Sequence, residues 1–199
     1  MSEPTTTSNT ASGTGSNDTK YVSTTRGVKG GYFFFAPGGT AAPTDIETPL
    51  AAAFKCGGFI GEDGFTESLD GDSDTLSDMN GDAVDTSGGA KTETCAATLI
   101  SMDENALSVQ YGSANVDASG GKFIKVSHNW SKAEEELVVV LELVLKNGRR
   151  WRKVIPACKV TELGEFTGNS TTLAGREVTF TYLVGADGAG CVDYIEKVA

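Results

Sequence analysis

The chain has 199 residues, of which 39% are apolar and 22% are charged, a balance typical of a globular protein. Its 16 Lys and Arg stand against 27 Asp and Glu, so the net charge at pH 7 is −11. A surface this acidic repels phosphate groups, which argues against tight nucleic-acid binding and against attachment to an anionic membrane. The acidic charge does not exclude a protein along which DNA slides without being bound.

The N-terminal segment is polar. Residues 1–20 are rich in Ser, Thr, Asn and Gly and contain almost nothing apolar. Such a segment buries too little apolar surface to offset the entropy lost on ordering. We therefore expect a flexible N-terminal arm over residues 1–30 and a folded domain over residues 31–199. The N-terminal arm is either solvated in the monomer or ordered on a neighbouring subunit.

The chain lacks the patterns of targeting and of metal binding. It opens without the basic region and apolar run of a secretory signal, and its longest apolar run, residues 137–145, is far shorter than a membrane span. We expect no membrane anchoring and synthesis in a cytosol, where cysteines stay reduced. No two cysteines are spaced as C-x-x-C and His128 is the only histidine, so no zinc site is expected. The cysteines are Cys56, Cys95, Cys158 and Cys191.

The first part of the expected domain alternates short strands with Gly-rich turns. Residues 31–36 are aromatic and bounded by Gly and Pro, which is typical of a strand, and a loop over residues 37–44 follows. Residues 50–55 fit one or two helical turns. A second strand, a turn and a third strand are expected over residues 57–61, 62–64 and 65–69.

Residues 70–91 form an acidic, Gly-rich stretch with few apolar side chains, which we expect to be a long loop. Loops of this length in compact domains are usually functional or mobile. Asn80 followed by Gly81 is a hairpin-turn signal, so part of the stretch has the pattern of a hairpin. Its start resembles a calcium-binding loop, but Thr75 and Gly81 stand where that loop requires Gly and Glu. The interface candidates here are Asp70, Asp72, Asp74, Asp78 and Asp82.

One short helix is expected in the middle of the chain. Residues 92–101 have a strand pattern, and Asp103 then offers an N-cap for a helix over residues 103–111. Gly112 stands where a glycine commonly ends a helix.

The second half of the chain has the pattern of antiparallel strands. Asn147 and Gly148 form the strongest hairpin-turn signal in the sequence. Along the strand before that turn, apolar residues occupy both faces with Glu142 as the exception, so we expect cover on both sides from a helix or another subunit. The expected strands span residues 123–130, 135–146, 149–157, 178–184 and 192–195.

The one basic cluster of the sequence surrounds this turn. A nucleic-acid site would need several stacking aromatics, and only Trp151 is present. We expect the cluster either to contact an acidic surface of a neighbouring copy, such as residues 70–91, or to be a solvated hairpin tip. Its members are Lys146, Arg149, Arg150, Arg152 and Lys153.

No residue pattern points to catalysis. Ser127 and His128 are adjacent in an expected strand and so face opposite sides, and no G-x-S-x-G elbow is present. Glu134, Glu135 and Glu136 are consecutive and do not face one another as a glycosidase pair does. We expect no enzyme activity, no metal and no cofactor.

Two motifs resemble those of a known family. Residues 31–44, GYFFFAPGGTAAPT, are similar to the opening of the major tail proteins (tail tube proteins) of long, non-contractile tailed phages. Residues 57–65, GGFIGEDGF, resemble the family's next motif, and a loop, a Thr-rich strand, a short helix and a closing hairpin follow in the family's order. The resemblance covers residues 31–195. The motif residues are Pro37, Gly38, Gly39, Thr40, Pro43, Glu62, Asp63 and Gly64.

The resemblance implies a mainly β fold, a β-sandwich or half-barrel with one short flanking helix, in a tail tube domain over residues 31–199. Copies would form rings, usually hexamers, whose strands join into a barrel, and the rings would stack into a hollow tube that delivers DNA to the host. Expected partners are other copies and the tape-measure, tail-tip and tail-terminator proteins, in a virion assembled in the host cytoplasm. The chain ends too early for the immunoglobulin-like domain that some relatives add.

Three other functions remain open from the sequence. A tube protein like that of type VI secretion would have a similar fold and effector partners. A surface carbohydrate-binding β module would need a cluster of exposed aromatics, and Trp130 and Trp151 are the only tryptophans. A small hydrolase would need a nucleophile and base, for which no pattern is present.

Overall fold

The computed structural model describes residues 18–166, 168–185 and 187–198. Strands dominate these ranges, together with one α-helix, α1 (Glu104–Tyr111). The strands are β1 (Thr25–Gly27), β2 (Phe33–Pro37), β3 (Lys55–Cys56), β4 (Ile60–Ser77), β5 (Ala83–Leu99), β6 (Val116–Asp117), β7 (Lys125–Val126), β8 (Glu136–Leu145), β9 (Arg150–Leu163), β10 (Arg176–Tyr182) and β11 (Val192–Ile195). Short 3-10 turns span Thr19–Tyr21, Ser113–Asn115, Trp130–Lys132 and Lys146–Gly148.

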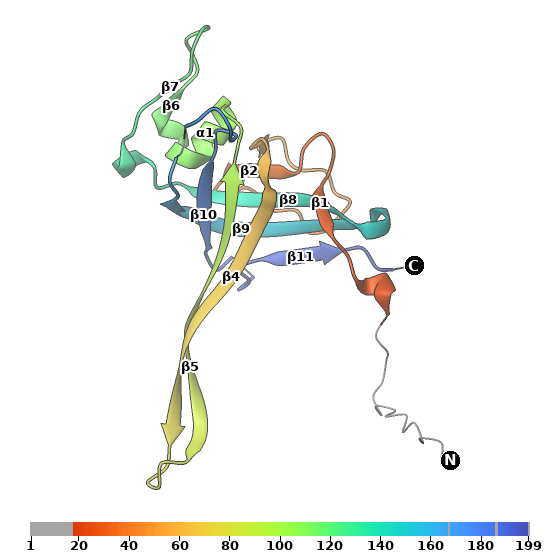
Figure 1. The fold of residues 1–199 in the computed structure, drawn as a ribbon, viewed down its shortest axis with the longest axis vertical. Coiled ribbons are helices and arrows are strands. Elements are labelled where there is room, and N and C mark those ends of the chain that lie inside the picture. Colours follow the sequence, from red (N-terminus) through yellow and green to blue (C-terminus); the bar gives the residue numbers. More distant parts are fainter. Residues whose placement is uncertain (1–17, 167, 186, 199) are drawn as a thin grey trace, which may run out of the picture.

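Nine of the strands in the described residues form one bent antiparallel sheet. Its order is β3-β2-β8-β9-β10-β5-β4, with β1 beside β8 and β11 beside β9, while β6 and β7 make a separate ribbon. In Figure 1, β8, β9 and β11 run across the view whereas β10, β5 and β4 run along it, so the sheet turns through a corner. The expected mainly β fold with one short helix is confirmed. Of the sandwich and the half-barrel, the described residues form the half-barrel, and the sheet does not close on itself.

The concave face of the sheet holds the core. Its buried side chains come from β2, β8, β9, β10 and β5, and Val109 of α1 packs among them. Alternation along β8 places Leu137, Val139 and Leu141 in this core. The strand is therefore covered on this face partly by a helix, as its apolar pattern indicated.

The opposite face of β8 and β9 is covered by the chain itself. Arg152 of β9 donates through Nη1 to the carbonyl oxygens of Asp45 (2.7 Å) and Thr48 (2.8 Å), so the segment between β2 and β3 lies over this face. Val138 and Val140 of β8 are fully buried. A neighbouring subunit is not needed to cover them.

The turn between β8 and β9 is the one that the sequence predicted. Asn147 and Gly148 have φ of 68° and 80°, the left-handed values that a type I′ turn requires. Lys146 also belongs to the loop, because the Leu145 amide donates to the carbonyl oxygen of Arg149 (2.7 Å), and this three-residue loop sets the register in which Glu142 lies opposite Arg152.

Residues 70–91 are not the long loop that we expected. They form the outer half of a hairpin made by β4 and β5, which pair from Leu69 and Glu93 outward to Ser77 and Ala83. A ladder of backbone hydrogen bonds needs no apolar side chains, and this is why a polar sequence adopts it. The Asn80–Gly81 signal does mark the turn, which Asp78 and Asp82 close.

Two other expected elements are wrong. The run over residues 50–55 forms a turn and then β3, since six residues make a marginal helix and Cys56 pairs instead with Phe34. The strand expected over residues 123–130 is reduced to β7, because His128 and Trp130 leave the sheet direction to stack near Tyr111.

The start of the sheet also differs from the expected domain boundary. β1 lies inside the segment expected to be flexible, and it pairs with β8 with Thr25 opposite Leu145. Residues 1–17 of the expected N-terminal arm lie outside the described residues.

Candidate functional site: a projecting hairpin and an open sheet edge

The hairpin of β4 and β5 projects far beyond the body of the molecule. It leaves the sheet near Glu67 and extends to one end of the view in Figure 1. From Glu67 to Thr92 every residue is exposed, so neither face of this ribbon is covered by the described part of the chain. An isolated two-stranded ribbon has little stability of its own in water. We call residues 70–91 the hairpin arm.

The hairpin arm is acidic with an apolar tip. It contains six Asp and one Lys. Near the tip, Leu76, Met79 and Val84 are 49%, 103% and 64% exposed. Exposed apolar groups on an uncovered ribbon are typical of a contact surface. All five predicted acidic interface candidates lie on the arm, namely Asp70, Asp72, Asp74, Asp78 and Asp82.

Asp78 organises the turn at the tip. Its Oδ1 accepts hydrogen bonds from the backbone N–H of Asn80 (2.8 Å) and of Asp82 (2.9 Å). The bond from the Asp82 amide is the largest of the effects that hold the pKa of Asp78 below its usual value. Asp78 is therefore a turn residue as well as a member of the acidic surface.

A buried lysine holds the root of the hairpin arm. Lys153 of β9 is 2% exposed, and its Nζ lies 2.9 Å from Oε1 of Glu67 and 3.1 Å from Oδ2 of Asp193. The Tyr182 hydroxyl also donates to Oε1 of Glu67 (2.7 Å). Burial lowers the pKa of Lys153, but the hydrogen bond to Glu67 and the negative charge of Asp193 outweigh it and the net pKa is raised. The ammonium thus joins β9 to β4 and β11.

The basic cluster of the sequence divides into two groups. Arg152 and Lys153 are buried, with Arg152 2.7 Å from Oε1 of Glu142 through Nη2, so they do not form part of an exposed basic patch. Lys146 and Arg150 are exposed, and Arg149 is half-buried. Arg150 lies 3.5 Å from Oε1 of Glu47 through Nη2, and Arg149 donates through Nε to the carbonyl oxygen of Glu196 (2.9 Å). Within the described residues, only Lys146 of the five has no side-chain hydrogen bond or ion pair.

The first family-like motif makes a tight turn at the end of β2. Gly38 donates to the carbonyl oxygen of Glu136 (2.7 Å), and a Cβ on Gly38 would lie 3.0 Å from that oxygen. Thr40 closes the turn by donating through its hydroxyl to the carbonyl of Pro37 (2.6 Å). Gly39 has a left-handed φ of 78°. This turn sends the following residues, including buried Pro43, back across the second face of the sheet.

The second motif is a bulge inside β4. Ile60 lies opposite Leu99 and Phe65 opposite Ala97, so four residues face one on the partner strand. Gly64 adopts φ of 73°, while Glu62 and Asp63 are exposed. A bulge bends its strand, and here it brings the Phe65 ring to 6.2 Å from that of Trp151. The motif expected to be a turn therefore shapes the edge of the sheet.

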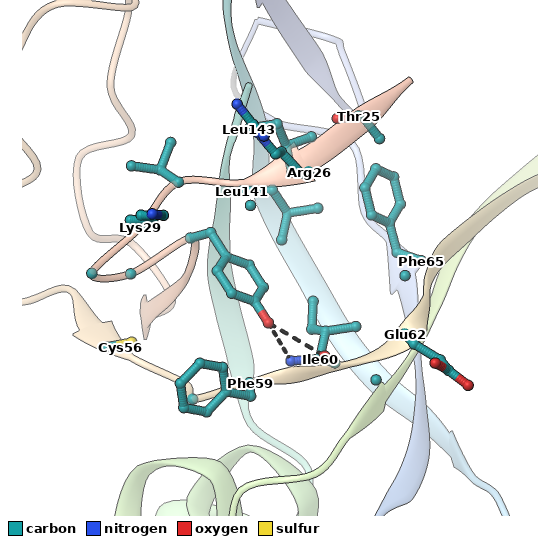
Figure 2. Close-up of a pocket in the computed structure, with 18 residues that line it drawn as sticks. Thr25, Arg26, Lys29, Cys56, Phe59, Ile60, Glu62, Phe65, Leu141 and Leu143 are labelled. Atoms are coloured by element: carbon teal, nitrogen blue, oxygen red, sulfur yellow. Dashed lines mark hydrogen bonds between the residues drawn. The ribbon is translucent and has the colours of Figure 1, made fainter. Parts of the chain in front are cut away.

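An apolar groove lies along this edge. It has a volume of about 680 Å³ and separates the segment from Thr25 to Tyr32 from the segment from Cys56 to Phe65. Figure 2 shows Leu141 between the two segments, with Leu143, Arg26 and Lys29 toward one side and Phe59 on the other. The Tyr32 hydroxyl accepts from the Ile60 amide (2.6 Å), and this bond links the two segments (dashed lines, Figure 2). We call this the edge groove.

Sequence reasoning missed the edge groove. Its residues are far apart along the chain, and only the bend of the sheet brings them together. The available signals were the two aromatics that flank the Glu-Asp-Gly motif, Phe59 and Phe65, and the basic residues Arg26 and Lys29 in a segment that we expected to be flexible.

The described residues show no group of three or more His, Cys, Asp or Glu that could hold a metal ion. The four cysteines are free thiols, with Cys95 and Cys158 buried. Within the described ranges, α1 falls well short of the length and hydropathy of a transmembrane helix.

An uncovered hairpin arm and an open apolar edge on one chain are typical of a structural protein that assembles with other copies of itself. The family is shown by comparison. A model of the phage tail tube protein family matches residues 14–199, and the chain belongs to that family. It is thus a structural component of a phage tail, as the motifs at residues 31–44 and 57–65 indicated.

Solved structures give a more distant likeness. The tube–sheath complex of an extracellular contractile injection system in its extended state has a chain that is 10% identical, with a TM-score of 0.38 over 82% of this chain and 88% of that one. The cap that terminates the tube of the anti-feeding prophage is 11% identical, with a TM-score of 0.36 over 85% and 92%. Among curated proteins no match was found.

Proposed function

We propose that this protein polymerises as stacked, hexameric rings into the tube of a long, non-contractile phage tail, through which DNA is delivered to the host. The observation that carries the proposal is the hairpin arm, whose faces are uncovered over residues 67–92. Membership of the tail tube family supports it.

A hairpin arm of this kind favours polymers over closed dimers. The surface that projects and the surface that receives it lie on different parts of the chain, so each copy offers both to different neighbours. Such head-to-tail contacts generate rings when the rotation closes and helical rows when it does not. A tube of stacked rings has closed contacts around each ring and open, repeating contacts from one ring to the next.

The open sheet edges support the same conclusion. Strand β4 lies at one end of the sheet order and β3 at the other, with β1 adjoining on β8, and the described sheet is not closed. Exposed edges pair readily with other chains unless they are covered. Pairing around a ring covers them all and produces a continuous barrel.

The charge of the protein suits a conduit. A net charge of −11 repels DNA phosphates, so DNA passes without being held. The tape-measure, tail-tip and tail-terminator proteins are the partners that the proposal requires at the bore and at the two ends of the tube. Assembly takes place in the host cytoplasm, and the product is part of the virion. No step requires catalysis or a cofactor.

Shortening the hairpin arm tests the proposal. Gly71 and Lys91 are paired, so residues 72–90 can be replaced by Asn-Gly, a turn that fits two paired flanking residues. We expect a folded monomer, with a circular dichroism spectrum and melting temperature close to those of the wild type, that forms no tubes in negative-stain images. As a control outside the hairpin arm, the substitution Gly121→Ala adds a Cβ with nothing within 4 Å of it and should leave tubes intact. Normal tubes from the shortened variant would contradict the proposed role of the hairpin arm.

A further inference from the structure

We propose that the edge groove is the socket that receives the tip of the hairpin arm from a second copy of this chain. The inference rests on the proposed function and deepens it, because it names the two surfaces that meet. The tip is the segment of Leu76 to Val84, and the socket is the groove between β1 and the start of β4.

The hairpin arm cannot reach the groove of its own chain. From Glu67 to Ser77 the strand advances about 33 Å, at roughly 3.3 Å per residue. Figure 1 shows that this advance is away from β1 and β2, with the tip at the opposite end of the molecule from α1. The occupant of the groove must therefore come from another copy.

The two surfaces match in polarity. The tip offers the apolar side chains of Leu76, Met79 and Val84, and Met79 is fully exposed. Phe59, at the groove, is 65% exposed in the free chain. A volume of about 680 Å³ lies within the range of sites that enclose a ligand of several side chains in size. The apolar walls and floor of the groove are formed by Val28, Tyr32, Phe59, Ile60, Phe65, Leu141 and Leu143.

They also match in charge. Asp74, Asp78 and Asp82 surround the apolar tip. Arg26 and Lys29 are charged residues at the groove. A third basic residue, Lys146, lies next to this end of β1. Leu145 pairs with Thr25, and the Lys146 amide donates to the Ser23 hydroxyl (2.6 Å). Opposite charges around an apolar contact accelerate association and fix its orientation.

A charge exchange tests this pairing. The socket variant is Arg26→Glu with Lys29→Glu, and the tip variant is Asp74→Lys with Asp82→Lys, none of which has a side-chain hydrogen bond or ion pair within the described residues. Each variant alone should lower tube yield at least tenfold in sedimentation assays, while the chain carrying all four substitutions should recover it. The control variant, Lys122→Glu with Lys125→Glu, makes the same change in net charge as the socket variant but at a site far from the groove. It should leave the tube yield unchanged.

A disulfide tests proximity independently. Cys56 is a free, half-buried thiol that lines the groove, and Figure 2 shows it at one end. In assembled Met79→Cys protein, the thiol-specific oxidant diamide should accept two electrons and two protons from the introduced thiol and the neighbour's Cys56. The S–S bond that forms should produce a ladder of linked chains on non-reducing gels. The same variant with Cys56→Ser should give no ladder.

The outcomes separate the two proposals. Wild-type tubes that persist in the socket and tip variants, or a Met79→Cys ladder that survives Cys56→Ser, would overturn the socket and leave the proposed function standing. Recovery of tubes on deleting residues 1–17 from the socket variant would assign the groove to that segment instead and also overturn the socket. A wild-type protein that stays monomeric at every concentration would contradict the proposed function, and the socket with it.

Discussion

Lys153 shows how one residue links the body of the molecule to its projecting part. A buried ammonium is costly unless charges of opposite sign surround it, and Glu67 and Asp193 supply them from β4 and β11. Trp151 contributes as well, because its indole N–H donates to Asp193 (2.6 Å). Lys153 thus joins the root of the hairpin arm to the body of the molecule.

The substitution Lys153→Met should destabilise the fold. Removing one partner from a buried ion pair costs about 3–5 kcal/mol, and the two carboxylates are partly exposed, so we expect a loss in the free energy of unfolding of about 3 kcal/mol. Urea unfolding measures it. Lys159→Met makes the same chemical change on the same strand at a half-buried site with no ion pair among the described residues, and should cost under about 1 kcal/mol. Equal losses from the two variants would show that Lys153 does not have this role.

The turn at the tip should loosen in acid. The pKa of Asp78 is lowered in the folded chain, mainly by the hydrogen bond from the Asp82 amide. A lowered folded-state pKa stabilises the turn above the unfolded pKa, about 3.9, and the contribution is lost as pH falls through the folded value. The amide resonances of Asn80 and Asp82 should therefore shift together on acidification from pH 5. Asp78→Asn keeps an acceptor oxygen without a charge, and a shift that persists in this variant would exclude Asp78 as the cause.

At the scale of elements, the bulge in β4 and the Tyr32 hydroxyl define the open edge. The bulge turns Phe65 toward Trp151, and the hydroxyl joins the β2 side of the groove to Ile60. Together they shape the groove, whose two edges, β1 and the start of β4, do not pair as strands.

The substitution Tyr32→Phe should weaken this junction. It removes the hydrogen bond accepted from the Ile60 amide and leaves that half-buried N–H unpaired, which costs about 1–2 kcal/mol. Chemical unfolding measures the loss. Tyr21→Phe, on a ring that is 63% exposed, should be neutral within about 0.5 kcal/mol. A neutral Tyr32→Phe would mean that the junction does not depend on the hydroxyl.

The sequence predicted the elements whose signals are local. The Asn147–Gly148 turn and the helix after Asp103 both formed where expected, and Gly112 ends the helix with φ of 84°. The partner of Glu142 could not be predicted in this way. A two-residue turn at Asn147–Gly148 would place Glu142 opposite Lys153, whereas Lys146 joins the loop and the shifted register places Glu142 opposite Arg152.

What the sequence could not predict depends on distant contacts. The hairpin arm is held by backbone pairing between polar strands, for which no side-chain period gives a signal. The edge groove depends on the bend of the sheet, which brings Arg26 near Phe65. Lys153 belongs by sequence to an exposed basic cluster, and only the cover over both faces of β9 shows that it is buried.

At the scale of the whole molecule, the acidic charge divides between the assembly surfaces and the rest of the protein. The hairpin arm carries six of the 27 acidic residues, and the socket brings them against basic groups. The remaining excess of negative charge stays on the assembled particle.

Assembled tubes should therefore not retain duplex DNA. We expect no DNA to co-sediment with tubes even at 50 mM salt, where non-specific binders hold DNA most tightly. A basic DNA-binding protein in the same buffer provides the positive control. If the tubes retain DNA and this retention weakens steeply with added salt, the tubes have a phosphate-binding surface. That result would contradict the proposal that DNA passes through the tube without being held.

The most direct measurement is a cryo-electron microscopy reconstruction of the polymer formed by the purified wild-type protein. We expect stacked rings around an open bore, with each hairpin arm covered by a neighbouring copy along its exposed length. Particles that remain single chains, or tubes in which residues 70–91 extend free into solvent, would show that the projecting hairpin does not build this assembly.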